Sequence, residues 1–475
     1  MSKLPLLDGI LKYVDENNTL FCMPGHKGGR GFLTTSIGEK FIRNLSKIDI
    51  TEVDGVDNLH KPNGIIKDSL EALSNFYGSK KSYFLVNGST SGNFIMIFSS
   101  FNEGDKILVE RNCHRSIFNA IIMRKLRPIY IKSVIDVRLN APAFIDLEHL
   151  SKEIDENKDA KGIIITYPNY YGLCSNLEYI IKKAKKNNMK VLVDSAHGAH
   201  FGVHEGLPKS ALKLGADMVV VSAHKTLPSF TQTAYLHINN LEDIQKVDFY
   251  TSAFLSTSPS YMLMCSMDYA RFFMESYGHE AYDKLLNTCK YYRKKINTIG
   301  GITILGKEYF KDNSKFFYDM DETRYIINLK RNYSSYKLLN YLKKNNIQAE
   351  MNDSSNVILI FSPFNEEEDF CKLYEVLKKC SLEELKCDEF QVLTPHIPRL
   401  KFLPFEVLNV DKKVIDLSEA LGEISAENIV PYPPGVPILN MGEIIDEKTI
   451  NCINYYLSNN VEVLGLNDRK IKVVR

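Results

Sequence analysis

The sequence has no excess of charge of either sign, because 59 Lys and Arg residues face 58 Asp and Glu residues among 475. This balance argues against a protein that coats nucleic acid or an anionic membrane. No apolar run approaches the roughly 18 residues that span a bilayer. Residues 1–18 carry acids in the first turns and no small-residue cleavage site. We therefore expect neither a membrane-spanning protein nor a secretory signal peptide.

The nine cysteines are scattered and form no C-x-x-C pair. In a chain of this length, such thiols are typical of a reduced protein of the cytoplasm rather than a disulfide-stapled one. The glycine-rich patterns G-x-x-x-x-G-K-[ST] and G-x-G-x-x-G are also absent, which argues against P-loop nucleotide hydrolases and dinucleotide-binding domains. Hydrophobic residues make up 44% of the chain, enough for a large core.

Apolar runs alternate with helical patterns through the middle of the chain. The runs predict buried parallel strands, and apolar residues at helical spacing predict a helix over 176–187. This alternation predicts a doubly wound α/β sheet of roughly 200 residues. The predicted parallel strands cover residues 82–86, 106–110, 161–167, 190–194 and 217–222, and residues 232–238 form one more strand.

We expect the chain to divide into three parts. Residues 1–45 form an N-terminal arm, with a helix over 4–14 and a glycine-rich loop after it. Residues 46–298 form the large α/β domain, which has a helix over 66–77 that Gly78 ends and a long helix over about 261–297. Residues 299–475 form a smaller α+β domain, with helices over 335–344 and 366–378. The proline-rich segment 431–443 cannot be a central strand.

Small hydroxyl residues follow the first predicted strand, in the turn 87–93 that runs into a helix. Ligands bind beyond the carboxyl ends of the strands in an open parallel sheet. The hydroxyls of Ser89, Thr90 and Ser91, together with the N-terminus of a helix, suit a phosphate group. The alternative is an ordinary strand–helix turn with a Ser or Thr N-cap.

Charged and aromatic side chains follow the other strands. Asp194 ends a buried strand, where a carboxylate needs a cationic partner, although such an Asp can also cap the next turn. A lysine in the position of Lys225 is usually a solvated charge, but a desolvated one can lose its proton and bond an aldehyde. His114 lies in a polar turn. Pyridoxal phosphate (PLP) needs a lysine, an acid at the ring nitrogen, a flat group over the ring and a site for its phosphate. These residues and the hydroxyls of the turn 87–93 supply all four.

Three histidines, His197, His200 and His204, have the spacing of metal ligands. Gly198 and Gly202 interrupt any helical face that they would share. We therefore expect no metal site there.

The motifs together resemble the Orn/Lys/Arg decarboxylase family, whose members are PLP-dependent enzymes with the aspartate-aminotransferase-like fold (fold type I). The resemblance covers nearly the whole chain, and the length resembles the short members, which lack an N-terminal wing domain. Two departures are Ser195, where a glutamate is common, and the lack of the usual proline before Gly442. The matching segments, in family order, are 23–29, 51–64, 87–93, 111–116, 194–200, 222–238, 256–264 and 431–437.

The resemblance implies a role for each matching residue. Lys225 would hold the cofactor covalently and His224 is a candidate proton donor, while Asp194 would pair with the pyridinium. Ala196 and His114 would enclose the ring, and His197 would lie near its O3′ side. Other implied contacts are Ser89, Thr90, Ser91 and Ser222 at the phosphate, Ser256 and Thr257 at the phosphate of the neighbouring subunit, and Glu443 at the substrate.

The resemblance also implies a reaction, the α-decarboxylation of a basic L-amino acid in a homodimer or larger homo-oligomer with shared sites. Arginine is favoured because short members often serve polyamine synthesis, and lysine or ornithine are alternatives. Two other functions stay open. One is an aminotransferase, for which Arg324, Arg331 or Arg399 could bind the substrate carboxylate. The other is an inert PLP-binding homologue, against which the intact Lys225 and Asp194 argue.

Overall fold

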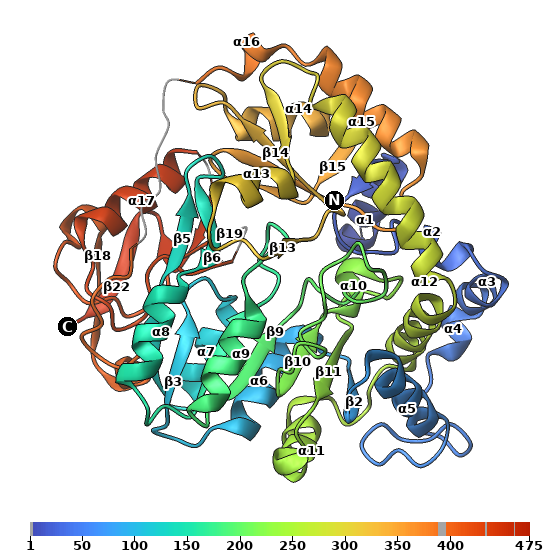
Figure 1. Cartoon of the computed structure of the whole chain (residues 1–475), viewed down its shortest axis with the longest axis horizontal. Helices are drawn as coiled ribbons and strands as arrows, with labels where there is room; N and C mark the ends of the chain where they lie inside the picture. Colours follow the sequence, from blue (N-terminus) through green and yellow to red (C-terminus); the bar gives the residue numbers. More distant parts are fainter. Residues whose placement is uncertain (1–2, 388–395, 433–434, 460) are drawn as a thin grey trace.

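A seven-stranded sheet forms the centre of the protein, as seen in a computed structural model that describes residues 3–387, 396–432, 435–459 and 461–475 (Figure 1). Its strands are short and rich in Val, Ile and Leu, as buried parallel strands require. All but β11 run parallel to one another, so their carboxyl ends meet at one edge. The order is β2 (Lys81–Leu85), β11 (Ala234–Ile238), β10 (Met218–Val221), β9 (Lys190–Asp194), β7 (Gly162–Thr166), β3 (Lys106–Glu110) and β4 (Arg127–Ile131).

Helices cover both faces of this sheet. α6 packs against β9, β10 and β11, and α7 and α11 pack on α6, whereas α8 and α9 lie together on the face that is nearer in Figure 1. Their bounds are α5 (Ile65–Tyr77), α6 (Gly88–Ser100), α7 (Arg115–Met123), α8 (Leu147–Glu156), α9 (Leu177–Lys186), α10 (Ala223–Thr226) and α11 (Ile244–Phe254). Gly78 ends α5 in the left-handed conformation, as predicted.

The 36-residue helix α12 (Tyr261–Ile296) leads from the large sheet to a smaller antiparallel one. The smaller sheet has the order β12 (Ile302–Leu305), β14 (Arg324–Leu329), β17 (Asn356–Ile360) and β16 (Met351–Asn352). α13 (Lys307–Asn313), α14 (Ser335–Lys344), α15 (Glu367–Lys379) and α16 (Leu382–Leu385) accompany it.

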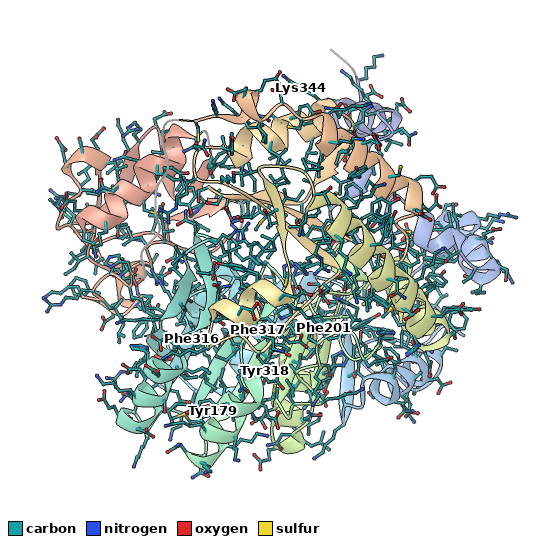
Figure 2. All side chains as sticks on the ribbon, turned by 45° about the horizontal axis from the view of Figure 1, so that its top comes forward. Tyr179, Phe201, Phe316, Phe317, Tyr318 and Lys344 are labelled. Atoms are coloured by element: carbon teal, nitrogen blue, oxygen red, sulfur yellow. The ribbon has the colours of Figure 1, made fainter. Side chains whose placement is uncertain are left out.

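Aromatic residues between α13 and β13 (Asp319–Met320) contact elements that flank the larger sheet (Figure 2). The ring of Phe317 lies 6.0 Å from that of Phe144 on β6 (Ala141–Ile145), which forms a hairpin with β5 (Ser133–Asp136). The hydroxyl of Tyr318 donates to Glu178 of α9 at 3.4 Å. β13 also pairs with β8 (Leu173–Cys174). The segment between α13 and β14 is therefore fixed against α9, the β5–β6 hairpin and β8.

The N-terminal segment lies beside the smaller sheet. Its strand β1 (Thr19–Phe21) pairs in parallel with β15 (Ile347–Ala349), and β15 contacts β17 of that sheet. Around β1 lie α1 (Pro5–Asp15), α2 (Arg30–Leu33), α3 (Ser36–Arg43) and α4 (Leu45–Ile48). Among the described residues, no helix has the length and apolar character needed to cross a membrane.

The C-terminal segment has a small core of its own, formed by residues such as Ile429, Leu439, Ile453 and Ile471. Its elements are β18 (Lys412–Asp416), β19 (Val430–Tyr432), α17 (Glu447–Ser458), β20 (Glu462–Leu464), β21 (Leu466–Asn467) and β22 (Lys470–Val474). Pro431 lies in β19, which pairs only with β20 among the described strands, so the proline-rich segment does contain a strand, though not a central one. Pro433 and Pro434 of the predicted motif lie outside the described residues.

Two features of the large sheet were not predicted. The strand over 232–238, β11, runs antiparallel to both of its neighbours, β10 and β2, whereas the strand predicted over 82–86 has the direction of the parallel strands. The short connection through α10 explains this, because only antiparallel neighbours such as β10 and β11 can be joined so directly. The strand β4 was not predicted. Its Pro128 weakens the strand pattern, and the structure tolerates this proline because β4 is an edge strand.

Candidate active site

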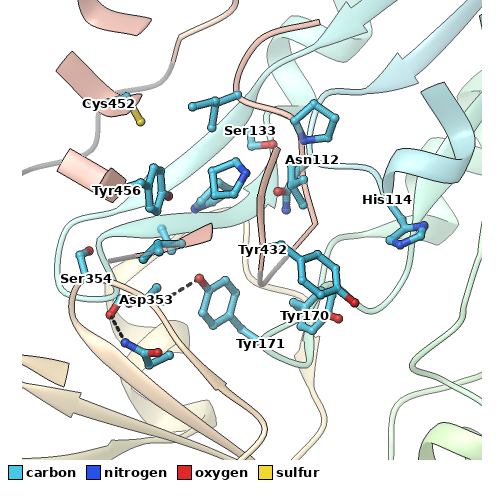
Figure 3. A pocket seen from close by; sticks show the side chains of 18 of the residues that line it. Asn112, His114, Ser133, Tyr170, Tyr171, Asp353, Ser354, Tyr432, Cys452 and Tyr456 are labelled. Atoms are coloured by element: carbon cyan, nitrogen blue, oxygen red, sulfur yellow. Dashed lines mark hydrogen bonds between the residues drawn. The ribbon is translucent and has the colours of Figure 1, made fainter. Parts of the chain in front are cut away.

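A cavity of about 1070 Å³ lies where the parallel strands end. Thr166 and Asp194 are opposite each other at the ends of β7 and β9, and α10 follows β10 at the same edge. Figure 3 shows His114 and Tyr170 on one side of the cavity and Tyr456 and Cys452 on the other. The predicted site residues that line the cavity are Ser89, Thr90, His114, Asp194, Ala196, His197, His224 and Lys225.

Lys225 extends from α10 into this cavity. Its Nζ lies 2.9 Å from Nε2 of His197 and 5.7 Å from the centre of the Tyr170 ring. Burial lowers the pKa of Lys225 to about 8, with a contribution from the Arg324 charge, while Asp194 and Glu350 act in the opposite direction. A substantial fraction of the amine is therefore neutral near pH 7.5, as a nucleophilic lysine requires.

His197 is held between Lys225 and a second cation. Its Nδ1 lies 3.0 Å from Nη2 of Arg324, and its ring lies 4.5 Å from that of Tyr170. Burial, followed by the charges of Lys225 and Arg324, lowers the pKa of His197 well below its usual value. The imidazole is therefore neutral at physiological pH.

Asp194 lies at the end of β9, with only 2% of its surface exposed. One carboxylate oxygen accepts a hydrogen bond from Asn93 Nδ2 at 2.8 Å, and the other accepts from the Ala196 N–H at 3.1 Å. Within the described ranges no cationic side chain forms an ion pair with it. A buried carboxylate without a cation favours a positively charged group in the cavity beside it.

His114 is the N-cap of α7. Its Nδ1 lies 2.9 Å from the Ser116 hydroxyl and accepts from the Ser116 N–H at 3.3 Å, so the ring orientation is fixed. Burial lowers the pKa of His114 to about 4. The cavity wall at this point is therefore a flat, uncharged ring.

The start of α6 presents hydroxyls to the cavity. Asn87, its N-cap, makes no side-chain cap, and Ser89 and Thr90 line the cavity. The buried Ser222 hydroxyl donates to Ser89 Oγ at 2.9 Å. Ser91 instead donates to the carbonyl of Gly88 at 2.8 Å and does not line the cavity. A helix N-terminus with these donors suits a phosphate.

Five predicted site residues do not line the cavity: Ser91 and Ser222, described above, and Ser256, Thr257 and Glu443. Ser256 and Thr257 are exposed, and neither caps α12, because Ser260 is its N-cap and accepts from Leu263 N–H at 3.5 Å. Glu443 is fully buried in an ion pair with Arg111. The structure thus gives Glu443 a partner from its own chain in place of the predicted substrate contact.

Several residues of the site were not predicted. Tyr170 follows the predicted strand 161–167, so the rule that placed Asp194 could have found it. Glu110 ends β3 and does not line the cavity, but it accepts from the N–H of the lining residue Thr166, and burial raises its pKa to about 8. Arg324, named above only as a possible ligand of the substrate carboxylate in an aminotransferase, starts β14 of the smaller sheet, and nothing in the sequence indicates that it reaches His197. The three histidines of the possible metal motif face different partners: His197 faces Lys225 and Arg324, His200 faces Asp321, and His204 faces Asp283.

Comparison with known proteins gives two family matches. Residues 4–331 match the family described as "Orn/Lys/Arg decarboxylase, major domain", and residues 404–462 match "Orn/Lys/Arg decarboxylase, C-terminal domain". An arginine decarboxylase of Bacillus subtilis is 34% identical over 99% of this chain and 97% of its own. An arginine decarboxylase of Halalkalibacterium halodurans is 32% identical over the same shares of the two chains.

Solved structures share the fold at lower identity. A lysine decarboxylase of Francisella novicida superposes with a TM-score of 0.78 at 21% identity, covering 96% of this chain and 79% of the other. A ureidoglycine-glyoxylate aminotransferase of Bacillus subtilis superposes with a TM-score of 0.56 at 12% identity, covering 76% of this chain and 92% of the other. The fold is therefore the PLP fold type I that was predicted.

Proposed function

The chain belongs to the Orn/Lys/Arg decarboxylase family, and we propose that it removes the α-carboxyl group of L-arginine as CO2 and leaves the corresponding amine. The chain is a PLP-dependent decarboxylase of a basic amino acid. Relatives named arginine decarboxylase, 31–34% identical, favour arginine over lysine and ornithine. The observation that carries the proposal is that Lys225, Asp194 and His114 line one cavity together with the start of α6.

The residues of the cavity fit PLP. When bound, PLP supplies an aldehyde that bonds an amine and a ring that withdraws the electrons released with CO2. Lys225 would hold the aldehyde, because its pKa of about 8 leaves far more of its amine neutral near pH 7.5 than an ordinary lysine has. Asp194 would keep the ring nitrogen protonated, which gives this buried carboxylate its missing cation. Ser89, Thr90, Ser222 and the N-terminus of α6 would hold the phosphate, and Ala196 and His114 would enclose the ring.

The proton that replaces CO2 at Cα has two candidate donors, Lys225 and His224. His224 donates its Nδ1 proton to the carbonyl of Thr233 at 2.9 Å, since a carbonyl can only accept. Burial lowers the pKa of His224 to about 4, so Nε2 carries no proton at neutral pH. We assign the donor role to Lys225, whose pKa near 8 lets it both take and give a proton.

The aminotransferase alternative needs an arginine that is available to the substrate carboxylate. Arg324 is fully buried, and its donors go to Asp321, to the carbonyl of Tyr170 at 2.9 Å and to His197. Arg331 and Arg399 are exposed and do not line the cavity. These placements favour decarboxylation over transamination.

Product analysis tests the proposal directly. The purified protein with added PLP is incubated separately with carboxyl-labelled L-arginine, L-lysine and L-ornithine, and labelled CO2 and the amines are measured. We expect CO2 and amine in equal amounts, fastest from arginine. Formation of a keto acid when a keto-acid acceptor is present, or a faster reaction with lysine, would contradict the proposal.

We further propose that the active enzyme is a homodimer with sites shared between subunits. Ser256 and Thr257 support this proposal, because they are exposed, lie outside the cavity of their own chain and do not cap α12. The Ser256 hydroxyl bonds within its own turn, to the carbonyl and the N–H of Ser258, so Thr257 is the stronger candidate donor to the phosphate of a neighbouring subunit. Each added donor stabilises a dianion.

A further inference from the structure

A line of buried side chains runs from the smaller sheet to Lys225. Arg324 is fully buried and its Nε donates to Asp321 at 3.3 Å, while Asp321 also binds His200 Nε2 at 3.0 Å. From this fixed position, Nη2 of Arg324 lies 3.0 Å from Nδ1 of His197, and Nε2 of His197 lies 2.9 Å from Nζ of Lys225. The line therefore connects Asp321 to the lysine through one arginine and one imidazole.

The arginine decides which nitrogen of His197 carries the proton. A guanidinium has only donors and stays protonated, so Nδ1 of His197 must accept and can carry no proton. The single proton of the neutral imidazole is then on Nε2, which faces Lys225. An ammonium at Lys225 would place its own proton against this N–H, whereas a neutral amine can accept from it.

We propose that Arg324 is a positioning residue that fixes His197 with its proton on Nε2 and thereby holds Lys225 as the neutral amine that bonds the cofactor aldehyde. This proposal rests on the assignment of Lys225 above. Other charged and titratable groups that act on Lys225 and His197 are Asp194, Glu350, His114 and His224. Arg324 differs from them because it contacts His197 directly.

The test follows how fast PLP becomes attached to the PLP-free protein at different pH values, with borohydride to fix the bond and peptide mapping to read Lys225. The attachment rate should rise with pH and level off above the pKa of Lys225. Arg324→Lys keeps a cation for Asp321 but cannot also reach His197. We expect the midpoint of its pH profile of attachment rate to lie about one pH unit higher, the size of one hydrogen bond between neutral groups.

Two further variants separate this role from a structural one. Arg293→Lys alters another buried arginine, paired with Glu322 outside the cavity, and should leave the midpoint in place. His197→Gln offers an amide that can accept from Arg324 and donate to Lys225, so its midpoint should stay within about half a unit of the parent protein.

A midpoint in Arg324→Lys equal to that of the parent, or an equal shift in Arg293→Lys, overturns the proposal. If Arg324→Lys does not fold, an upward shift of about one unit in His197→Gln overturns it instead. Absence of label on Lys225 in the parent protein would refute the cofactor assignment itself.

Discussion

Glu443 accepts two hydrogen bonds of 2.9 Å from the guanidinium of Arg111, which lies 332 residues earlier in the chain. Glu443 also accepts from the Asn440 N–H, and its side chain is fully buried. Since Arg111 lines the cavity, this pair joins the C-terminal segment to the wall of the active site. A buried bidentate pair of this kind is costly to break, because the remaining charge loses its partner.

Glu443→Gln should therefore lower the free energy of unfolding by about 3 kcal/mol. Denaturant unfolding followed by circular dichroism measures the change. Glu423→Gln is a matched control, since its pair with Lys413 is partly exposed and should contribute less than about 1 kcal/mol. The double variant Arg111→Met/Glu443→Leu should recover much of the lost stability. A loss in Glu443→Gln no larger than in the control would show that the pair contributes little.

Lys225 should be the lysine that PLP labels, and Lys225→Ala should abolish turnover. Lys27 is the informative comparison, because burial also lowers its pKa to about 8. Its Nζ donates to the carbonyls of Cys22 and Ile360 and does not line the cavity. Peptide mapping after borohydride reduction should find the label on Lys225 alone, and label on Lys27 would contradict the assignment.

Asp194→Asn should reduce kcat by about 100-fold or more while the fold persists, because an amide cannot stabilise a protonated ring nitrogen by charge. Steady-state kinetics and thermal unfolding measure the two effects separately. Asp217→Asn is the control. Like Asp194, Asp217 accepts from a backbone N–H, that of Val191 at 2.8 Å, but it pairs with Lys185 and lies outside the cavity. Comparable losses in the two variants would argue against a role at the ring nitrogen.

Glu110 should make stability fall as pH rises. Burial raises its pKa to about 8 from an ordinary value of 4.5, so the folded protein binds a proton that the unfolded chain releases between these values. The stabilisation is complete below pH 4.5 and is lost as pH rises to about 8. Between pH 6 and 8 the loss should be about 2 kcal/mol. Glu110→Gln should flatten this dependence, and the exposed Glu103→Gln should not. Parallel pH profiles for the parent protein and Glu110→Gln would refute the assignment.

Mixed dimers test the shared site. Lys225→Ala chains are combined with chains in which Ser256 and Thr257 are both alanine, and activity is measured at limiting PLP. If sites are shared, one site of each mixed dimer receives both lesions and the other receives neither. Half of the dimers are mixed after random exchange, so about a quarter of the parent activity should return. No recovery in mixtures that contain mixed dimers, or a monomeric active species, would contradict the proposal.

The strands were the most predictable part of the fold, because their apolar runs need nothing beyond local sequence. The predicted strands 106–110 and 190–194 have the bounds that the structure shows. Since parallel strands end at one edge, the same runs also predicted that Asp194 and Lys225 would line one cavity. The antiparallel direction of β11 and the edge strand with Pro128 depend on pairing partners, which local pattern does not specify. The proposed boundaries of the three parts stay predictions.

Residues from the smaller sheet could not be predicted in the same way. Arg324 reaches His197 only because the chain from α12 to β14 folds back toward the site, and contacts such as Phe317 with Phe144 of the β5–β6 hairpin accompany this folding. The pairing of Glu443 with Arg111 is equally non-local. A motif match assigns a residue to a site, but the partner that neutralises it comes from tertiary packing.

The pairing of β1 with β15 has a consequence for the synthesis of the protein. Thr19 faces Ile347, so 328 residues must be translated after the first strand before its partner exists. At a synthesis rate of about 5–20 residues per second, roughly 16–66 s pass between the synthesis of Thr19 and that of Ile347. Met23, which lines the cavity, has its N–H bonded to Glu350 beyond β15. The strands of the large sheet are all made before β15, since the last of them ends at Ile238, whereas this part of the cavity wall is completed only by the last third of the chain.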